Sequence, residues 1–405
     1  MSAPEPSLRR VLSLPWLVLY GLGTTIGAGI YALTGVVAGR AGLLAPVAFL
    51  VAALFALFTA LSFAELSSRF PKAGGEAVYV REGFGRADLQ LAVGLLVVAA
   101  GLISAATVSV GFVGYLSVFV SVPKLVTVLG IVVALGLIVS WGVRESVTAA
   151  GLMTLLEVGG LLALIAYGSP HFAEFPSRAP EIFAGGSEGF RGVGSAAVLA
   201  FYAFLGFEDI VNAAEETKNA RRTLPLAILI TLGITAGLYF AVASLAVLVV
   251  PPAELAASAA PLALVFERCG GPAGALSVIA LFALLNGALI QVMKASRVLW
   301  GMADQGVLPA ALRYIHPRSR TPLVAVGLAT GGTGILAVAF PLETLAETTS
   351  LVTLLTFTLA NLALLRVKLR DPDPPPGAMI FPIWVPIVGA ILSGGLLTFD
   401  LVNRL

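Results

Sequence analysis

Charged side chains are scarce in this chain, because only 11% of its 405 residues are Asp, Glu, Lys or Arg and 58% are hydrophobic. An ordinary soluble domain carries about 25% charged residues. The composition therefore indicates an all-α protein that crosses a lipid bilayer many times. The formal net charge is only +2, which gives no indication of nucleic-acid binding.

Cysteine and histidine are also nearly absent. Cys269 is the single cysteine, so no disulfide can form within the chain, and with only His171 and His316 a His/Cys metal site is not expected. The sequence shows no His-Glu-x-x-His or Gly-x-Ser-x-Gly motif, which argues against a membrane enzyme. The sequence also contains neither a filter ring nor a repeated pore loop, which argues against a channel. We expect no metal, no cofactor and no cleavable signal.

Long apolar stretches are what the sequence does contain. Eleven of them are long enough to cross about 30 Å of hydrocarbon as helices. They lie near residues 14–39, 43–69, 87–120, 124–142, 146–168, 190–215, 225–250, 272–302, 322–340, 343–366 and 380–403.

The distribution of Lys and Arg predicts the orientation of these spans in the plasma membrane. With the N-terminus in the cytoplasm, 18 of the 24 basic residues fall inside and six fall outside, namely Arg40, Lys124, Arg178, Arg191, Arg268 and Arg404. An odd number of spans then places the C-terminus outside.

The predicted organisation has six parts. A cytoplasmic tail (1–13) precedes five spans (14–168), an external loop (169–189) and five further spans (190–366). A stiff, Pro-rich cytoplasmic linker (367–379) then leads to a last helix (380–405).

Two spans are interrupted at corresponding positions. The first holds four glycines between Gly21 and Gly29, each costing about 1 kcal/mol relative to Ala inside a helix. The sixth reads FYAFLGFED over residues 201–209. Interrupted helices in matching places of two halves are typical of inverted-repeat transporters, where irregular backbone lines a binding cavity. The alternative is a pair of Gly-kinked helices that only pack tightly.

Several ordered motifs favour the transporter interpretation. They are IGAGIY at 26–31, AELSSRFPKAGG at 64–75, FLGFE at 204–208 with AEETKN at 214–219, and SRVL at 296–299 with ADQGVLP at 303–309. Over roughly residues 12–370 the chain resembles the amino acid–polyamine–organocation superfamily of permeases. The resemblance implies a leucine-transporter-like fold of two inverted five-helix repeats, and secondary transport of amino acids or related amines.

The resemblance also implies that the broken helices 1 and 6 hold the substrate. Family patterns place its contacts at Thr25, Ile26, Gly27, Ala28 and Gly29, and at Tyr202, Ala203 and Leu205. Free N–H groups at the first break favour a carboxylate, and free carbonyls at the second suit an ammonium group. Phe201, Tyr202 or Phe204 is a candidate lid, although aromatic residues in membrane helices more often only pack.

Buried acids are the candidates for proton coupling. Glu157 lies at mid-span, where a charged acid costs about 2.5–3.5 kcal/mol, and it stands where some proton-coupled members carry a lysine. We expect it to take up and release a proton, and the alternative is a structural acid. Glu208 follows the second break, where it either braces helices 1 and 6 or senses protons, and Asp209 beside it is expected to be secondary.

Charges near the predicted cytoplasmic face form a candidate inner gate. Glu215 and Glu216 lie near Lys218, and Arg297 is expected on the same side of the membrane. The alternative is a solvated rim, where exposed pairs contribute about 0–1 kcal/mol each. Glu65 and Arg69 are one helical turn apart and are expected to be structural.

The sequence thus predicts a proton-coupled symporter for amino acids, with a slight preference for small or apolar ones. The first rival is an exchanger that swaps one amino acid or amine for another, and the second is a transport-dead protein that only binds and signals. The twelfth helix usual in the superfamily is missing, so the sequence does not indicate an oligomeric state.

Overall fold

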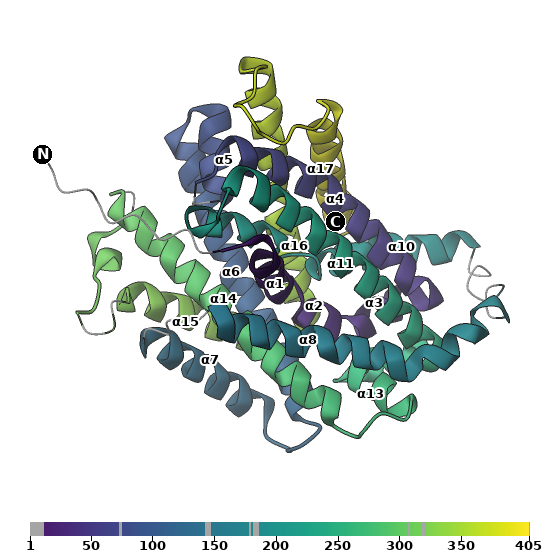
Figure 1. Cartoon of the computed structure of the whole chain (residues 1–405). Helices are drawn as coiled ribbons and strands as arrows, with labels where there is room; N and C mark the ends of the chain where they lie inside the picture. Colours follow the sequence, from purple (N-terminus) through teal and green to yellow (C-terminus); the bar gives the residue numbers. More distant parts are fainter. Residues whose placement is uncertain are drawn as a thin grey trace, which may run out of the picture.

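The computed structural model describes residues 12–72, 75–141, 147–177, 180, 186–306, 308–317, 319 and 321–404. Over these residues the chain is almost entirely helical, with no strand beyond a single bridge between Leu12 and Thr217. Eight helical segments are long and apolar enough to cross a membrane, and two shorter apolar helices accompany them. The prediction of an all-α, multi-pass membrane protein is confirmed (Figure 1).

Each of the eleven predicted stretches corresponds to one helix or to a set of consecutive helices. The first stretch is divided into α1 (Leu14–Thr25), α2 (Ala28–Tyr31) and α3 (Thr34–Ala41). The remainder of the first half comprises η1 (Gly42–Leu44), α4 (Ala45–Arg69), α5 (Gly75–Phe84), α6 (Ala87–Leu116), α7 (Lys124–Trp141) and α8 (Val147–Gly168).

The second half follows the same order. After η2 (Ser169–Glu174), the sixth stretch is divided into α10 (Gly186–Tyr202) and the 3-10 helix η3 (Phe207–Glu216). The rest comprises α11 (Ala220–Val249), α12 (Pro252–Ala257), α13 (Pro261–Arg268), α14 (Ala275–Asp304), η4 (Ala310–Arg313), α15 (Leu323–Ala339), α16 (Leu342–Arg370) and α17 (Trp384–Arg404).

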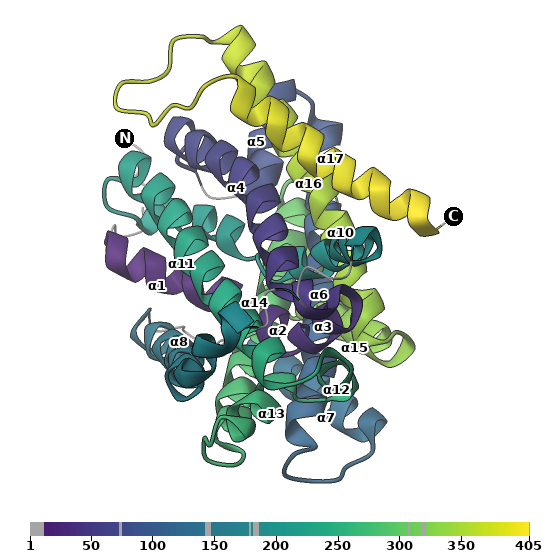
Figure 2. The same ribbon diagram turned by 90° about the vertical axis from the view of Figure 1, so that its right-hand side faces the viewer.

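The contacts between helices show the internal symmetry of an inverted repeat. α1 packs on α11 as α4 packs on α10, and α8 packs on α14 as α16 packs on α6. Corresponding long helices also pack against one another, α4 with α11 and α6 with α14. In each half, short helices connect the second span to the third. These connections lie at opposite ends of the molecule, with α5 of the first half near the top of Figure 2 and α12 and α13 of the second half near the bottom.

Small residues make up much of the inward face of α4, although Phe49 and Phe63 are buried on this helix as well. On α4 the buried face carries alanines at helical spacing, Ala45, Ala48, Ala52, Ala56 and Ala60. Its exposed face carries larger residues, Leu50, Leu54 and Leu57. Small residues let neighbouring backbones approach closely, whereas large apolar side chains are compatible with lipid on the outside. This pattern brings α10 and α11 against α4 and so places the sixth span beside the first.

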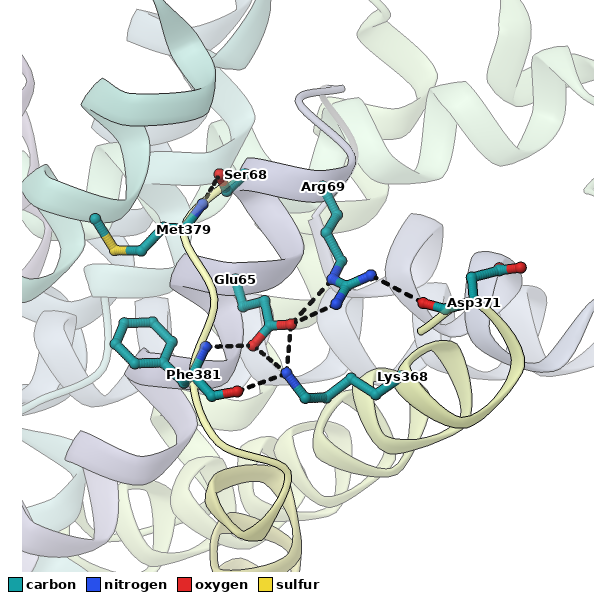
Figure 3. A network of polar contacts seen from close by, with 7 residues as sticks. All are labelled: Glu65, Ser68, Arg69, Lys368, Asp371, Met379 and Phe381. Atoms are coloured by element: carbon teal, nitrogen blue, oxygen red, sulfur yellow. Dashed lines mark hydrogen bonds and ion pairs between the residues drawn. The ribbon is translucent and has the colours of Figure 1, made fainter. Parts of the chain in front are cut away.

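A buried ion-pair network fastens the last helix to this core (Figure 3). The Glu65 carboxylate on α4 accepts from Arg69 Nε at 2.9 Å and from Lys368 Nζ at 2.5 and 2.6 Å. The backbone N–H of Phe381, just before α17, also donates to Glu65 at 3.0 Å. The pairing of Glu65 with Arg69 that the sequence predicted is present, and its extension to Lys368 and Phe381 was not predicted.

Candidate functional site

The first span is broken at Ile26 and Gly27. The regular hydrogen bonding of α1 ends where the Ile26 N–H donates to the Leu22 carbonyl, and it resumes where the Tyr31 N–H donates to the Gly27 carbonyl. Ile26 itself is extended, with ψ of 117°. The carbonyl of Thr25, released from the helix, accepts a hydrogen bond from the Tyr239 hydroxyl of α11 at 3.0 Å.

The sixth span is broken over residues 203–206. The chain tightens after α10, since the N–H groups of Ala203, Phe204 and Leu205 each donate to a carbonyl three residues earlier. Gly206 then adopts a φ of +125°, which residues with a side chain rarely adopt. Its N–H donates to Glu208 Oε2 at 2.7 Å. Glu208 therefore holds the turn that separates α10 from η3.

The two breaks touch each other. A Cβ added to Gly206 would lie 2.3 Å from the Thr24 carbonyl oxygen, and one added to Gly29 would lie 2.2 Å from the Ala203 Cα. The Thr24 hydroxyl also donates to the Gly206 carbonyl at 2.9 Å. Because neither glycine has a side chain, the interrupted backbones of the first and sixth spans come into direct contact.

The predicted substrate contacts all lie in this region. Thr25, Ile26 and Gly29 are buried in the first span, Gly27 is half-buried, and the side chain of Ala28 lies outside the part that the structure describes. In the sixth span Tyr202 and Ala203 are buried and Leu205 is half-buried.

Two cavities adjoin the second break. The smaller, of about 20 Å³, is lined by Leu205 and Glu208 together with residues of α5, α6, α14 and α16. The larger, of about 770 Å³, lies between α1, α5, α6, η3 and α14. Arg297 and Gln305 in its lining are exposed, so this cavity opens to the surface where α14 ends.

The opposite end of the molecule is held together by charge. Arg40, at the end of α3, pairs with Glu347 on α16 at 2.6 Å and also with Glu343. This contact bridges α3, the last part of the broken first span, and α16, the tenth span. The sequence identified Arg40 only as an external charge, because its partners are about 300 residues away.

Two of the three candidate lid residues, Phe201 and Phe204, pack against other aromatic rings. Phe201 packs edge-on against Phe357 of α16, with ring centroids 6.0 Å apart, and Phe204 packs on Tyr239 at 5.2 Å. Both phenylalanines are buried. The Tyr202 hydroxyl lies 3.0 Å from Ser104 Oγ on α6. A lid role for any of them stays a prediction.

Glu157 is completely buried on α8, where that helix meets both parts of the first span. Its Oε1 accepts from Asn286 Nδ2 of α14 at 3.3 Å, whereas its Oε2 is buried and has no hydrogen-bond partner within the described part of the chain. Its backbone carbonyl accepts from the Tyr31 hydroxyl of α2 at 2.9 Å. One turn earlier, Thr154 packs against Gly23 of α1. The segment of α8 around Glu157 therefore contacts both α1 and α2 of the broken first span.

A buried lysine escaped the sequence interpretation. Lys294 was counted as a cytoplasmic charge, yet its side chain is only 15% exposed and its Nζ lies 2.6 Å from Asp209 Oδ1. Asp209, which the sequence treated as secondary, is thus an ion-pair partner of α14. The available signal was the position of Lys294, about three turns before the end of a long apolar helix.

Glu76, on the short helix α5 outside the spans, lines both cavities together with Lys294. Burial raises the pKa of the Glu76 carboxyl above its ordinary value, and the positive charge of Lys294 acts in the opposite direction. This acid was also missed, because α5 reads as part of a polar loop in the sequence.

The residues of the candidate inner gate, Glu215, Glu216 and Arg297, are not joined by an ion pair among the side chains that the structure describes. Glu216 is half-buried at the end of η3, and Arg297 is exposed on α14. The side chain of Glu215 lies outside the described residues. The Leu12 N–H donates to the Glu216 carbonyl at 2.9 Å, which ties the start of the chain to this region. Gating stays a prediction.

Two interrupted spans that meet inside a helical membrane bundle, beside a cavity open at one end, define a transporter of the inverted-repeat class. Residues 12–402 match the family model described as amino acid permease. The chain belongs to this family, within the amino acid–polyamine–organocation superfamily.

The relatives extend over nearly the whole chain. The branched-chain amino acid permease of Bacillus subtilis is 32% identical over 93% of this chain and 86% of its own length. Human cationic amino acid transporter 4 is 32% identical over 92% of this chain, and the match covers 62% of the human protein. A methylthioribose transporter of Bacillus subtilis is 29% identical over 97% of this chain and 88% of its own length.

Proposed function

We propose that this protein imports amino acids across the plasma membrane by alternating access, coupled to protons. The observation that carries the proposal is the direct contact of two broken spans beside a large cavity that opens at one end. A break of this kind offers backbone dipoles to a ligand at membrane depth. The printed names of the relatives, a branched-chain amino acid permease and a cationic amino acid transporter, favour an amino acid as that ligand.

The two breaks suit the two charged groups of an amino acid. The α-carboxylate would lie at Gly27 to Gly29, where the second part of the first span begins and N–H groups point outward. The α-ammonium would face the carbonyls of Ala203 and Leu205, to which no backbone N–H donates among the hydrogen bonds of the described residues. Because Gly29 lies against Ala203, the substrate would lie beside this contact, and it would reach or leave the site through the large cavity next to η3.

The cavity and the external ion pairs support an inward-open state. The large cavity opens at the end that carries Arg81 and Arg297, which the distribution of basic residues predicts to be cytoplasmic. The contact of Arg40 with Glu347 closes the opposite end. Transport would then require the helices around the breaks to rock until this contact separates and the inner cavity closes.

Glu157 is the proposed proton carrier. An ionised carboxylate is costly at this buried position, because among the described residues the Asn286 amide is its one hydrogen-bond partner and the second oxygen has none. Protonation would remove that cost, and the contacts of Tyr31 and Thr154 would convey the change to both parts of the first span. Glu208 is the second candidate, although its hydrogen bond to Gly206 also serves the turn.

Uptake into proteoliposomes tests the proposal. Vesicles without internal substrate receive a pH gradient, acidic outside, and each of the twenty amino acids is offered as radiolabel with and without a protonophore. Symport predicts accumulation of at least one amino acid that the protonophore abolishes. Uptake only into vesicles preloaded with substrate would instead identify an exchanger.

A binding measurement separates transport from sensing. The melting temperature of the purified protein should rise with the amino acid that is transported. A rise without uptake under any gradient would identify a binding protein that does not transport. If no amino acid or related amine raised the melting temperature or entered the vesicles, the proposed function would be wrong.

A further inference from the structure

A cluster of four ionisable side chains lies beside the second break, apart from Glu157. Lys294 of α14, Glu208 of η3 and Glu76 of α5 line the small cavity together with Leu205. Asp209 of η3 lines the large cavity on the other side, with Glu76 and Lys294. The cluster therefore separates the region of the proposed substrate site from the open cavity.

The lysine is a cation held in a site rich in acids. Asp209 is 2% exposed, and only one of its carboxylate oxygens meets Lys294 Nζ, at 2.6 Å. The other oxygen, Oδ2, is buried and has no hydrogen-bond partner among the residues that the structure describes. Asp209 therefore keeps an unused acceptor beside Lys294, and the carboxyl groups of Glu76 and Glu208 line the small cavity with this lysine. Such a site has the chemistry to bind an ammonium or guanidinium group.

We propose that Lys294 occupies, as a tethered cation, the subsite that would otherwise receive the positively charged side chain of a basic amino acid, and so restricts the protein to neutral substrates. The inference rests on the proposed function. Leu205, a proposed substrate contact, borders the same small cavity as Lys294, so a long side chain directed from the break would point toward the cluster. With Lys294 in place this cavity measures about 20 Å³, which is too small for such a side chain. There the ammonium group of Lys294 repels a second cation and already occupies Asp209.

Removal of the tethered cation should therefore change selectivity. In Lys294→Met the carboxylates lose their internal counter-ion, and a substrate cation can replace it. We expect the ratio of lysine uptake to leucine uptake to rise by about tenfold or more. Lys294→Arg keeps a cation at the same place and should keep the selectivity of the natural protein. Asp209→Asn combined with Lys294→Met removes the cation's partner and should abolish the gain.

Chemical rescue tests the subsite without transport. In Lys294→Gly the missing side chain corresponds to n-butylammonium, so this ion should raise the melting temperature of the purified variant. It should not do so in Asp209→Asn combined with Lys294→Gly. Choline, which is also a cation but cannot donate N–H hydrogen bonds, is the control for general salt effects.

Distinct outcomes would overturn the inference. The first can be found without any variant. It is that lysine or arginine raises the melting temperature of the natural protein, and is taken up by it, as strongly as a neutral amino acid. Another is a folded Lys294→Met protein that still discriminates against lysine. Failure of the natural protein to bind any amino acid would instead count against the proposed function.

Discussion

Two buried glutamates in this molecule differ sharply in how they are compensated. Glu65 and Glu157 are both completely buried on long membrane helices. Glu65 accepts hydrogen bonds from Arg69, Lys368 and the Phe381 N–H, so each of its oxygens has a partner. Among the residues that the structure describes, Glu157 has one amide partner at 3.3 Å, and its second oxygen has none.

The difference shows how the same residue type serves two purposes. A fully paired carboxylate joins the elements that supply its partners, and at Glu65 these are α4, α16 and the segment before α17 (Figure 3). An incompletely paired carboxylate can change its charge without breaking several bonds at once. We therefore regard Glu65 as an anchor and Glu157 as the candidate for a change of protonation.

The largest effect on stability is expected from Glu65→Gln. This substitution leaves Arg69 and Lys368, whose side chains are 4% and 8% exposed, without a counter-charge. Removal of one partner from a buried ion pair typically costs about 3–5 kcal/mol. We expect a large fall in the melting temperature in detergent and loss of most folded protein. A melting temperature within a degree of the natural protein would contradict the role as an anchor.

Lys368→Met should destabilise the protein less than Glu65→Gln. Glu65 then keeps Arg69 and the Phe381 N–H, whereas the Phe381 carbonyl loses the donor that lies 2.7 Å away. The variant loses three hydrogen bonds, two to Glu65 and one to the Phe381 carbonyl, but Glu65 keeps Arg69 as its counter-charge. We therefore expect a cost of about 1.5–3 kcal/mol, smaller than that of removing the shared carboxylate. The melting temperatures of the two variants, measured side by side, check the order. If Lys368→Met were the more damaging change, the network would depend on the lysine rather than on the shared carboxylate.

The network also shows what could be predicted from the sequence. Glu65 and Arg69 are four residues apart in one helix, so local periodicity suffices to pair them. Lys368 and Phe381 come from about 300 residues away. No local pattern specifies that contact, because it depends on how α16 and the linker pack on α4.

The same distinction applies to the candidate site. The glycines of the first span and the FYAFLGFED segment indicated both breaks, because glycine and adjacent acids are locally unfavourable in a membrane helix. Their direct contact, through Gly29 and Gly206, is a property of tertiary packing. The ion pair of Lys294 with Asp209 was missed for that reason too. Charge counting treated this lysine only as a charge on the cytoplasmic side, although it lies within the predicted span 272–302 and within α14.

Glu157→Gln should have little effect on stability and a large effect on coupling. The amide oxygen of Gln can still accept from Asn286, and the other position of the side chain has no partner in either case. We expect a change in unfolding free energy below about 1 kcal/mol. Accumulation in proteoliposomes should no longer follow an imposed pH gradient, because the side chain cannot exchange a proton.

Glu174→Gln is the matched control for that experiment. Glu174 is exposed at the end of η2, and its substitution should leave the response to the pH gradient intact. Two results would end the contrast between the glutamates. One is a Glu157→Gln variant that accumulates substrate with the natural dependence on pH, and the other is one that melts as early as Glu65→Gln.

Glu343→Gln should have the smallest effect and tests whether burial, rather than pairing alone, makes the Glu65 network strong. Glu343 also pairs with an arginine, but the side chains of Arg40 and Glu343 are 29% and 42% exposed. Exposed pairs contribute about 0–1 kcal/mol and are screened by salt, and Arg40 keeps Glu347 as a partner. We expect a slight fall in melting temperature at low ionic strength that disappears in about 1 M salt, where the Debye length is near 3 Å. A loss as large as that of Glu65→Gln, or one that persists in high salt, would show that the contact of Arg40 with Glu343 contributes as much to stability as the buried network does.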